Sequence, residues 1–312
     1  MSNASAFAEW LRRHGHKVYQ SASSYWYDAA PFVLQAFPYG WLIEPSEAEL
    51  NELMNRANAL AVRYSAPLRY PHGMLSYHVV LEPPYSLEML RSQARNAVKR
   101  GLEHCNIQEI PFERAACEGW ALQRDTLERQ HRTRSMSHAE WECLCLSARD
   151  LPGFQAWGAT VAGELAALLL TCRIDDVFYV PYAASHHKFL NLHVNNALFY
   201  QVTCNLLATD GIKSIFFSLH SLDAPKSVNE FKFRMGFQAR AVRQCVVFHR
   251  LVRLFVNHHS CTLITWLAKY FPESVLLPKT RGMMTYYLNG KIPLEQQTWP
   301  EEVDEKWRKI TL

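Results

Sequence analysis

Residues 155–182 read QAWGATVAGELAALLLTCRIDDVFYVPY, and this stretch decides the fold. Apolar runs are separated here by two short groups of turn formers, VAGE and DD. Such a pattern predicts strands joined by tight turns. We expect an antiparallel meander with strands at 155–160, 165–174 and 177–182.

Helical and extended patterns alternate after this meander. We expect a loop over 183–192, helices at 194–209 and 227–234, and strands at 214–219 and 241–248. Asp210-Gly211 and Gly236 stand where the two helices should end. Hairpins followed by a helix, strand, helix, strand order predict a mixed α/β (α+β) sheet with helices on its faces.

The first third has a similar order of elements. Ser46, with Glu49 three residues later, has the spacing of a capping box and predicts a helix start. Gly101 stands at the usual position of a glycine that ends a helix. The expected helices are 7–13, 46–62, 86–100, 117–131 and 250–271, the expected strands are 75–81 and 102–110, and a loop with a charged tail should follow residue 272.

Three stretches resemble the FemAB/FemX-like acyltransferases of the N-acetyltransferase (GNAT) superfamily. They are LEMLRSQARNAVKRG at 87–101, DGIKSIFF at 210–217 and NEFKFRMGF at 229–237. The resemblance implies two GNAT-like lobes in tandem, a degenerate one at 1–112 and one with the active site at 113–250. A helical extension would then occupy 251–312.

The same resemblance implies transfer of an acyl or aminoacyl group to an amine or hydroxyl. Enzymes of this kind use acyl-CoA or aminoacyl-tRNA as donor, and their acceptors are often cell-envelope or polysaccharide precursors. The long helical arm of the tRNA-dependent enzymes has no counterpart in this sequence, which favours acyl-CoA. The [RQ]-x-x-G-x-[GA] pyrophosphate loop of acetyl-CoA enzymes is also missing, so a non-catalytic binding protein with this fold remains the alternative.

Composition sets the broad class. The chain has 312 residues, of which 49% are hydrophobic and 20% charged, as in folded globular proteins. A net charge of +4 is too small for a dedicated nucleic-acid binder, and DNA is not an expected partner. The N-terminus has no secretory pattern and the eight cysteines have no pairing rhythm. We therefore expect a soluble cytoplasmic protein with reduced thiols.

Arg91, Arg95 and Lys99 are candidate substrate-binding residues. Their spacing of four places them on one face of the expected helix, where they can hold a phosphate or carboxylate together. The alternative is a solvated helix face. Arg95 matches an arginine of the resembling enzymes.

Lys232 is the main catalytic candidate. It lies between Phe231 and Phe233, so its stem should run through apolar surroundings and its charge can stabilise an oxyanion. In the resembling enzymes the matching lysine lies at the acyl-donor site. The alternative is a surface lysine beside two core aromatics. Arg234 is a supporting substrate-binding cation.

The loop before the expected helix at 194 contains several polar candidates. A helix N-terminus offers free N–H groups that bind phosphate, so His187, Asn191, His193 and Asn195 are candidate residues for binding the acyl-CoA co-substrate. His186 is a candidate general base. No metal is expected, because adjacent histidines rarely point at one ion.

Tyr182 is the third catalytic candidate, because it directly precedes this loop and a tyrosine can protonate a leaving thiolate. The alternative is a half-buried packing residue on a strand. The expected helix at 250–271 combines leucines and aromatics with Arg250, Arg253 and Lys269. It can pack on the core or rest on a membrane surface, which would make the protein peripheral to a membrane.

Overall fold

The computed structural model describes residues 4–130, 136–220, 226–271, 273–274, 276–304 and 307. The chain forms two compact units, each built from separate stretches of sequence. Unit 1 contains residues 1–15, 79–218 and 223–238, and unit 2 contains residues 16–78, 219–222 and 239–312. This differs from the contiguous division at residues 112 and 250 expected from the sequence, because the chain passes between the units within β5 (Met74–Leu81), β10 (Ser214–Leu219) and β11 (Gln238–Phe248).

Unit 1 is built on a mixed sheet with the strand order β10-β9-β8-β7-β6. β6 (Asn106–Ile110), β7 (Phe154–Val161), β8 (Glu164–Ile174) and β9 (Val177–Ser185) are antiparallel neighbours, and β10 pairs with β9 in parallel. The expected meander is therefore confirmed. β8 is buried almost throughout, as its run of alanines and leucines predicts for a central strand.

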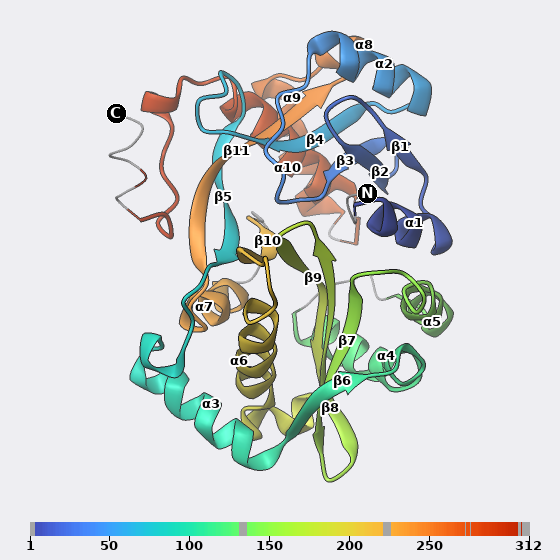
Figure 1. Ribbon diagram of the computed structural model, residues 1–312. Coiled ribbons are helices and arrows are strands. Elements are labelled where there is room, and N and C mark those ends of the chain that lie inside the picture. The colour runs from blue at the N-terminus through green and yellow to red at the C-terminus, as the bar shows by residue number, and fades with distance from the viewer. Residues whose placement is uncertain are drawn as a thin grey trace. The chain divides into compact units, whose positions relative to one another are not determined.

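Two pairs of helices accompany this sheet (Figure 1). α4 (Phe112–Arg129) packs on β7, β8 and β9 and on α5 (His138–Leu146), whereas α6 (Val194–Leu207) packs on β6, β7 and β8 and on α3 (Ser92–His104). α1 (Ala4–Arg13) contacts α5 and β8. The short helices η1 (Leu87–Met89) and η2 (His187–Leu192) and the helix α7 (Lys226–Arg234) complete the unit.

Unit 2 has the strand order β1-β2-β3-β4-β11-β5. Its elements are β1 (Val18–Gln20), β2 (Tyr25–Ala30), β3 (Val33–Phe37), α2 (Glu47–Ala57), β4 (Ala61–Ala66), α8 (Arg250–Arg253), α9 (His258–Tyr270), α10 (Leu276–Asn289) and η3 (Leu294–Gln296). One cluster of buried side chains, which includes Trp26, Leu53 and Tyr64, joins α2 to the sheet. A second cluster, which includes Val246, Phe248 and Met283, lies under α9 and α10. The fold class expected from the sequence, mixed α/β, is confirmed.

Several expected boundaries in the first half were wrong. Ser46 does cap α2, but the helix ends at Ala57 because Asn58 takes a left-handed conformation with φ of 49°. The apolar residues after it belong to the buried strand β4 rather than to the helix. The expected helix at 86–100 is a short η1 followed by α3, which continues through Gly101 to His104. The helix expected from residue 117 begins at Phe112, directly after Pro111.

Other differences concern the second half and the N-terminal region. The region expected as a loop over 183–192 contains the end of β9 and the whole of η2. The helix expected at 250–271 is two helices, because a capping box at Asn257 starts α9 anew. α10 lies where a loop was expected, and β1, β2 and β3 were not predicted. Within the described residues, no helix is long and apolar enough to cross a membrane.

Candidate functional site

A pocket of about 270 Å³ lies in unit 1 where β9 and β10 part. The two strands pair in parallel from Ser214 and Val177 to Phe216 and Tyr179. Beyond this stretch the pocket is lined by residues 183–185 of β9 and Phe217 of β10. Side chains from α4, α6 and α7 close it, among them Arg129, Asn195 and Lys232. The pocket is therefore assembled from five elements of one unit.

Lys232 is the buried cation of this pocket. The residue is only 7% exposed, and its ammonium donates a hydrogen bond of 2.9 Å to Ser218 Oγ. The same nitrogen lies 5.0 Å from the centre of the Phe217 ring, a cation–π contact. Phe231 packs edge-on against Phe199, so aromatic rings form the apolar part of the wall. Lys232 is therefore buried, as the sequence predicted, but the aromatic ring beside its ammonium is Phe217 of β10 rather than one of the flanking phenylalanines.

Ser185, at the end of β9, connects three elements at the pocket. Its N–H donates to Thr126 Oγ1 at 2.9 Å, and its carbonyl accepts from Thr126 Oγ1 at 3.0 Å. Arg129 Nη2 donates to the same carbonyl at 2.9 Å and to Ser185 Oγ at 3.1 Å. Asn195 Nδ2 donates to Ser185 Oγ at 3.0 Å. This network fixes the guanidinium of Arg129 and the amide of Asn195 at the pocket.

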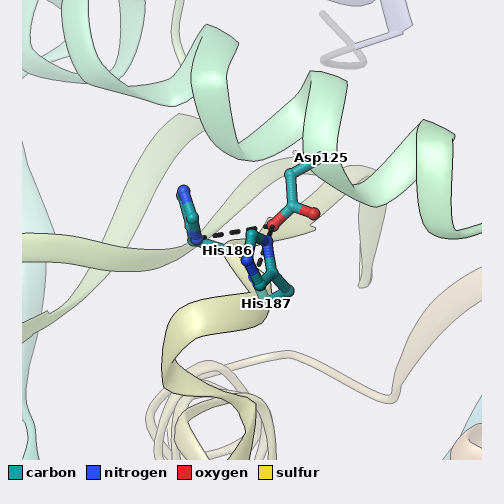
Figure 2. Close-up of side chains that lie close together, drawn as sticks. All are labelled: Asp125, His186 and His187. Carbon is teal, nitrogen blue, oxygen red and sulfur yellow. Dashed lines mark hydrogen bonds and ion pairs between the residues drawn. The ribbon is translucent and has the colours of Figure 1, made fainter.

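Asp125 carries a second network just behind this wall, shown in Figure 2. Its Oδ2 atom accepts a hydrogen bond from the backbone N–H of His187 and lies 3.1 Å from His187 Nδ1 and 3.5 Å from His186 Nδ1. Arg129 Nε lies 3.4 Å from its Oδ1 atom. Burial by itself would raise the pKa of Asp125. The hydrogen bonds from His187 and the charge of Arg129 outweigh this effect, so the pKa is lowered from its ordinary value of 3.8.

The same three side chains are close enough together to be considered as ligands of a metal ion. Ligand atoms of Asp125, His186 and His187 all lie within 4.8 Å of one another. The argument that adjacent histidines diverge does not hold here, because both rings turn toward one carboxylate. However, the single lone pair of His186 Nδ1 accepts the backbone N–H of Lys188 at 3.2 Å. A metal at this atom would have to displace that hydrogen bond, so the arrangement favours an anchor for the start of η2.

The other residues predicted around the loop before α6 lie outside the pocket wall, except Asn195. His186 caps η2, His187 is exposed beside Asp125, and Asn191 is exposed. His193 takes a left-handed conformation with φ of 56° and forms no side-chain cap for α6. A Cβ at Gly101 would lie 2.6 Å from the His193 carbonyl oxygen, so α3 and this helix start are in close contact.

The remaining predicted residues are also placed away from the pocket. The Tyr182 ring packs edge-on against Trp10 and Trp141, with ring centres 6.4 Å and 5.6 Å apart. Arg91 precedes the first turn of α3, so it does not share a helical face with Arg95 and Lys99 as expected.

Arg95 and Lys99 lie near an acidic side chain, Glu88. Hydrogen bonds of Ser86 and of the Glu88 backbone, with the charges of Arg95 and Lys99, lower the pKa of Glu88. Arg234 is exposed and donates to the Glu230 carbonyl at 3.4 Å. None of the four predicted cations, Arg91, Arg95, Lys99 and Arg234, is among the described residues that line the pocket.

Four residues of the site were missed by sequence reasoning: Asp125, Thr126, Arg129 and Ser185. Thr126 follows Leu122 at helical spacing on the buried face of α4, which also contains Gln123 and Asp125, and Arg129 comes three residues later. Polar groups on such a face are an available signal, because buried polar groups need partners. The spacing of residues in α4 does not show that the partner of Thr126 is Ser185 at the end of β9, 59 residues away along the chain.

Comparison with known proteins gives the fold. The sequence matches no family model and no curated protein. Among solved structures it is similar to FemX, with a TM-score of 0.56 and 10% identity over 80% of this chain and 92% of that chain. A conserved protein of unknown function from Bacteroides thetaiotaomicron gives 0.54 and 8% identity over 79% and 90%.

A third similar structure is the C-terminal domain (DUF2156) of a protein described as a lysylphosphatidylglycerol synthetase from Agrobacterium fabrum. Its TM-score is 0.50 at 11% identity, over 85% of this chain and 91% of that domain. At this level of identity the likeness shows the fold alone. The expected tandem GNAT-like, FemX-like fold is confirmed.

Proposed function

We propose that this protein is an acyltransferase that moves an acyl group from an activated ester or thioester to an amine or hydroxyl. The observation that carries this proposal is the pocket between β9 and β10. Two cations, Lys232 from α7 and Arg129 from α4, line it, and no carboxylate is found among the described residues of its lining. A partly apolar pocket of this charge suits a ligand that bears, or develops, negative charge.

Acyl transfer develops negative charge at one atom, the carbonyl oxygen of the donor. The acceptor nitrogen or oxygen attacks the carbonyl carbon, the bond to the leaving group breaks, and the acceptor's proton goes to the leaving group or to solvent. A buried ammonium near that oxygen stabilises the transition state more than the ground state. Lys232 fits this role, because Ser218 and the Phe217 ring hold its ammonium in place.

We propose acyl-CoA as the donor, with aminoacyl-tRNA as the alternative. α6 begins without a side-chain cap from His193, and Asn195 of its first turn lines the pocket. The first N–H groups of such a helix attract a phosphate group, which CoA supplies as a diphosphate. For the acceptor we propose a cell-envelope or polysaccharide precursor, on the strength of the resemblance alone.

The test combines ligand binding with turnover. Thermal stability is measured with CoA, short and long acyl-CoAs and an aminoacyl ester of adenosine, and thiol release from each acyl-CoA is followed with small amines as acceptors. A donor that binds only the native state raises the melting temperature. Lys232→Met should lower the rate of transfer by about 10²–10³-fold, the usual cost of removing one oxyanion donor. Lys232→Arg keeps the charge and should recover part of it.

A matched control is Lys213→Met, because Lys213 is 80% exposed and bonded to Asp176 on the surface of the same unit. It should leave both readouts unchanged. A shift with the aminoacyl ester but none with acyl-CoA would replace the proposed donor by aminoacyl-tRNA. Indifference to every donor, in stability and in turnover, would overturn the acyltransferase and favour a non-catalytic binding protein.

A further inference from the structure

Unit 2 presents a group of large apolar side chains to solvent on α8, α9 and the residues that join and follow them. We name it the α8–α9 apolar face. Its members are Leu251 (66% exposed), Leu254 (78%), Phe255 (73%), Leu263 (55%), Trp266 (51%), Tyr270 (64%) and Phe271 (58%). An exposed group of this kind, on consecutive elements, is typical of an interaction surface.

α9 has two apolar sides, one packed on unit 2 and one that belongs to this face. Cys261 and Ile264 of α9 contact the buried cluster around Val246 and Met283, which holds the helix on unit 2. Leu263, Trp266 and Tyr270 lie at a spacing of three and four and form a different stripe. A surface helix normally has polar residues on that side. Core packing therefore accounts for one side of α9 and leaves the other unexplained.

The connection between the two helices holds its apolar residues outward. Asn257 and Ser260 form a reciprocal capping box, with hydrogen bonds of 3.0 Å in both directions. Ser260 Oγ also donates to the Phe255 carbonyl at 2.7 Å. These hydrogen bonds hold the backbone of residues 255–260 in one conformation. In this conformation Leu254 and Phe255 are more than 70% exposed.

The segment that carries this face has a net positive charge, although Arg253 Nη1 lies 3.5 Å from Glu47 Oε1 of α2. Residues 250–290 contain five lysines and arginines and one acidic residue, Glu273, so their net charge is +4, equal to that of the whole chain. Arg250, Arg253 and Lys269 are exposed within or beside the face itself. The rest of the chain therefore has no net charge, and the net positive charge of this segment favours contact with an anionic surface.

We propose that the α8–α9 apolar face docks on an anionic lipid surface. Tryptophan, tyrosine and phenylalanine beside lysine and arginine is the combination that partitions into the headgroup region of a bilayer. α9 has 13 residues, too few to cross a bilayer, so it would lie in the interface plane. A second copy of the chain is less suited, because a two-fold contact would bring the same positive charges together.

Vesicle co-sedimentation of the full chain tests this inference. Binding is measured to phosphatidylcholine vesicles with and without phosphatidylglycerol, at low and high salt. We expect binding to the anionic vesicles that weakens as salt is raised, because surface charges are screened. Phe255→Ser should weaken it by about tenfold, the cost of losing one buried aromatic side chain. Arg250→Glu combined with Lys269→Glu should weaken it at least as much.

Phe32→Ser is the matched control, since Phe32 is 64% exposed in the turn between β2 and β3 of the same unit. It should leave vesicle binding unchanged, and circular dichroism should show that every variant is folded. Equal weakening by Phe32→Ser, or no binding to anionic vesicles at any salt, would overturn the inference. A concentration-dependent dimer that Phe255→Ser dissociates would overturn it in favour of a second copy. Neither outcome changes the acyltransferase proposal, because that proposal is tested with variants of Lys232 in unit 1.

Discussion

At the scale of single residues, the pocket depends on side chains that bond to backbone groups. Ser185 N–H and carbonyl are satisfied by Thr126, and Arg129 adds a charged donor to the same carbonyl. Asp125, one position before Thr126 on α4, does the same for the N–H of His187. Two consecutive residues of one helix thereby hold the end of β9 and the start of η2. Arg129 bonds to both networks, which links the pocket wall to the carboxylate behind it.

Asp125 gives a prediction for the dependence of stability on pH. Its pKa in the folded protein is lowered below the ordinary 3.8. Its ionised form is therefore favoured by folding, and this contribution is present above the unfolded pKa and is lost as pH falls through the folded pKa. Asp125→Asn should lower the free energy of unfolding by about 1–3 kcal/mol near neutral pH. Urea denaturation of both proteins over the acid range measures the difference.

The difference between wild type and Asp125→Asn should shrink as pH falls below about 4. A difference that stays constant down to the acid limit of folding would show that the carboxylate charge has no part in it. Asp210→Asn, a surface change at the turn after α6, serves as the control and should leave stability near that of the wild type.

At the scale of elements, the start of α6 is set by its contact with α3. Gly101 lies inside α3, and a side chain there would meet the His193 carbonyl and Ala197 Cβ at 2.6 Å and 2.8 Å. The glycine thus allows two helices to approach closely, and it does not end a helix as the sequence suggested. Since Asn195 of α6 lines the pocket, this contact positions one wall of the site.

Gly101→Ala should destabilise the protein by about 1–3 kcal/mol, because the added methyl group overpacks the contact between α3 and α6. Gly282→Ala is the control, and we expect it to change the free energy of unfolding in the opposite direction. Gly282 also lies inside a helix, α10, but nothing lies within 4 Å of the position a Cβ would take. It should stabilise by about 0.5–1 kcal/mol through helix propensity alone. The midpoints of urea denaturation distinguish the two, and equal signs would contradict the close contact.

At the scale of the whole molecule, unit 1 depends on the first residues of the chain. α1 is separated from the rest of the unit by more than 60 residues of unit 2. Phe7 and Trp10 are nevertheless buried to 1% and 2% exposure, and both rings contact Phe154 of β7. Trp10 Nε1 also donates to the Leu144 carbonyl of α5 at 2.9 Å. A lobe cut out as residues 113–250 would lack these contacts.

Trp10→Ala should lower the free energy of unfolding by about 3–5 kcal/mol, the cost of removing a buried large aromatic side chain. Met89→Ala, at a residue of the same unit that is 56% exposed, should change it by less than about 0.5 kcal/mol. Urea denaturation and hydrogen exchange of α5 and β7 measure the effect. Unchanged protection of these elements in Trp10→Ala would show that α1 is not part of the unit 1 core.

Some elements and site residues could be predicted from the sequence and others could not. The meander over 154–185 was predicted nearly in full, because alternation and turn residues are local properties of the chain. Lys232 and Asn195 were identified and lie at the pocket, whereas His186 and Tyr182 were identified and lie elsewhere. A residue near a loop can point to several sides, and only the packing of Tyr182 between Trp10 and Trp141 decides its direction.

The sequence by itself determined the fold class and the central meander, because each follows from the order of neighbouring residues. The tertiary structure decided three other things: that Arg129 and Thr126 meet Ser185, that α1 completes unit 1, and that α9 has an apolar side left in solvent. The first two join residues far apart along the chain, and the third depends on which side of α9 packs on unit 2. No local pattern encodes such a contact, since it exists only after the separate stretches have packed.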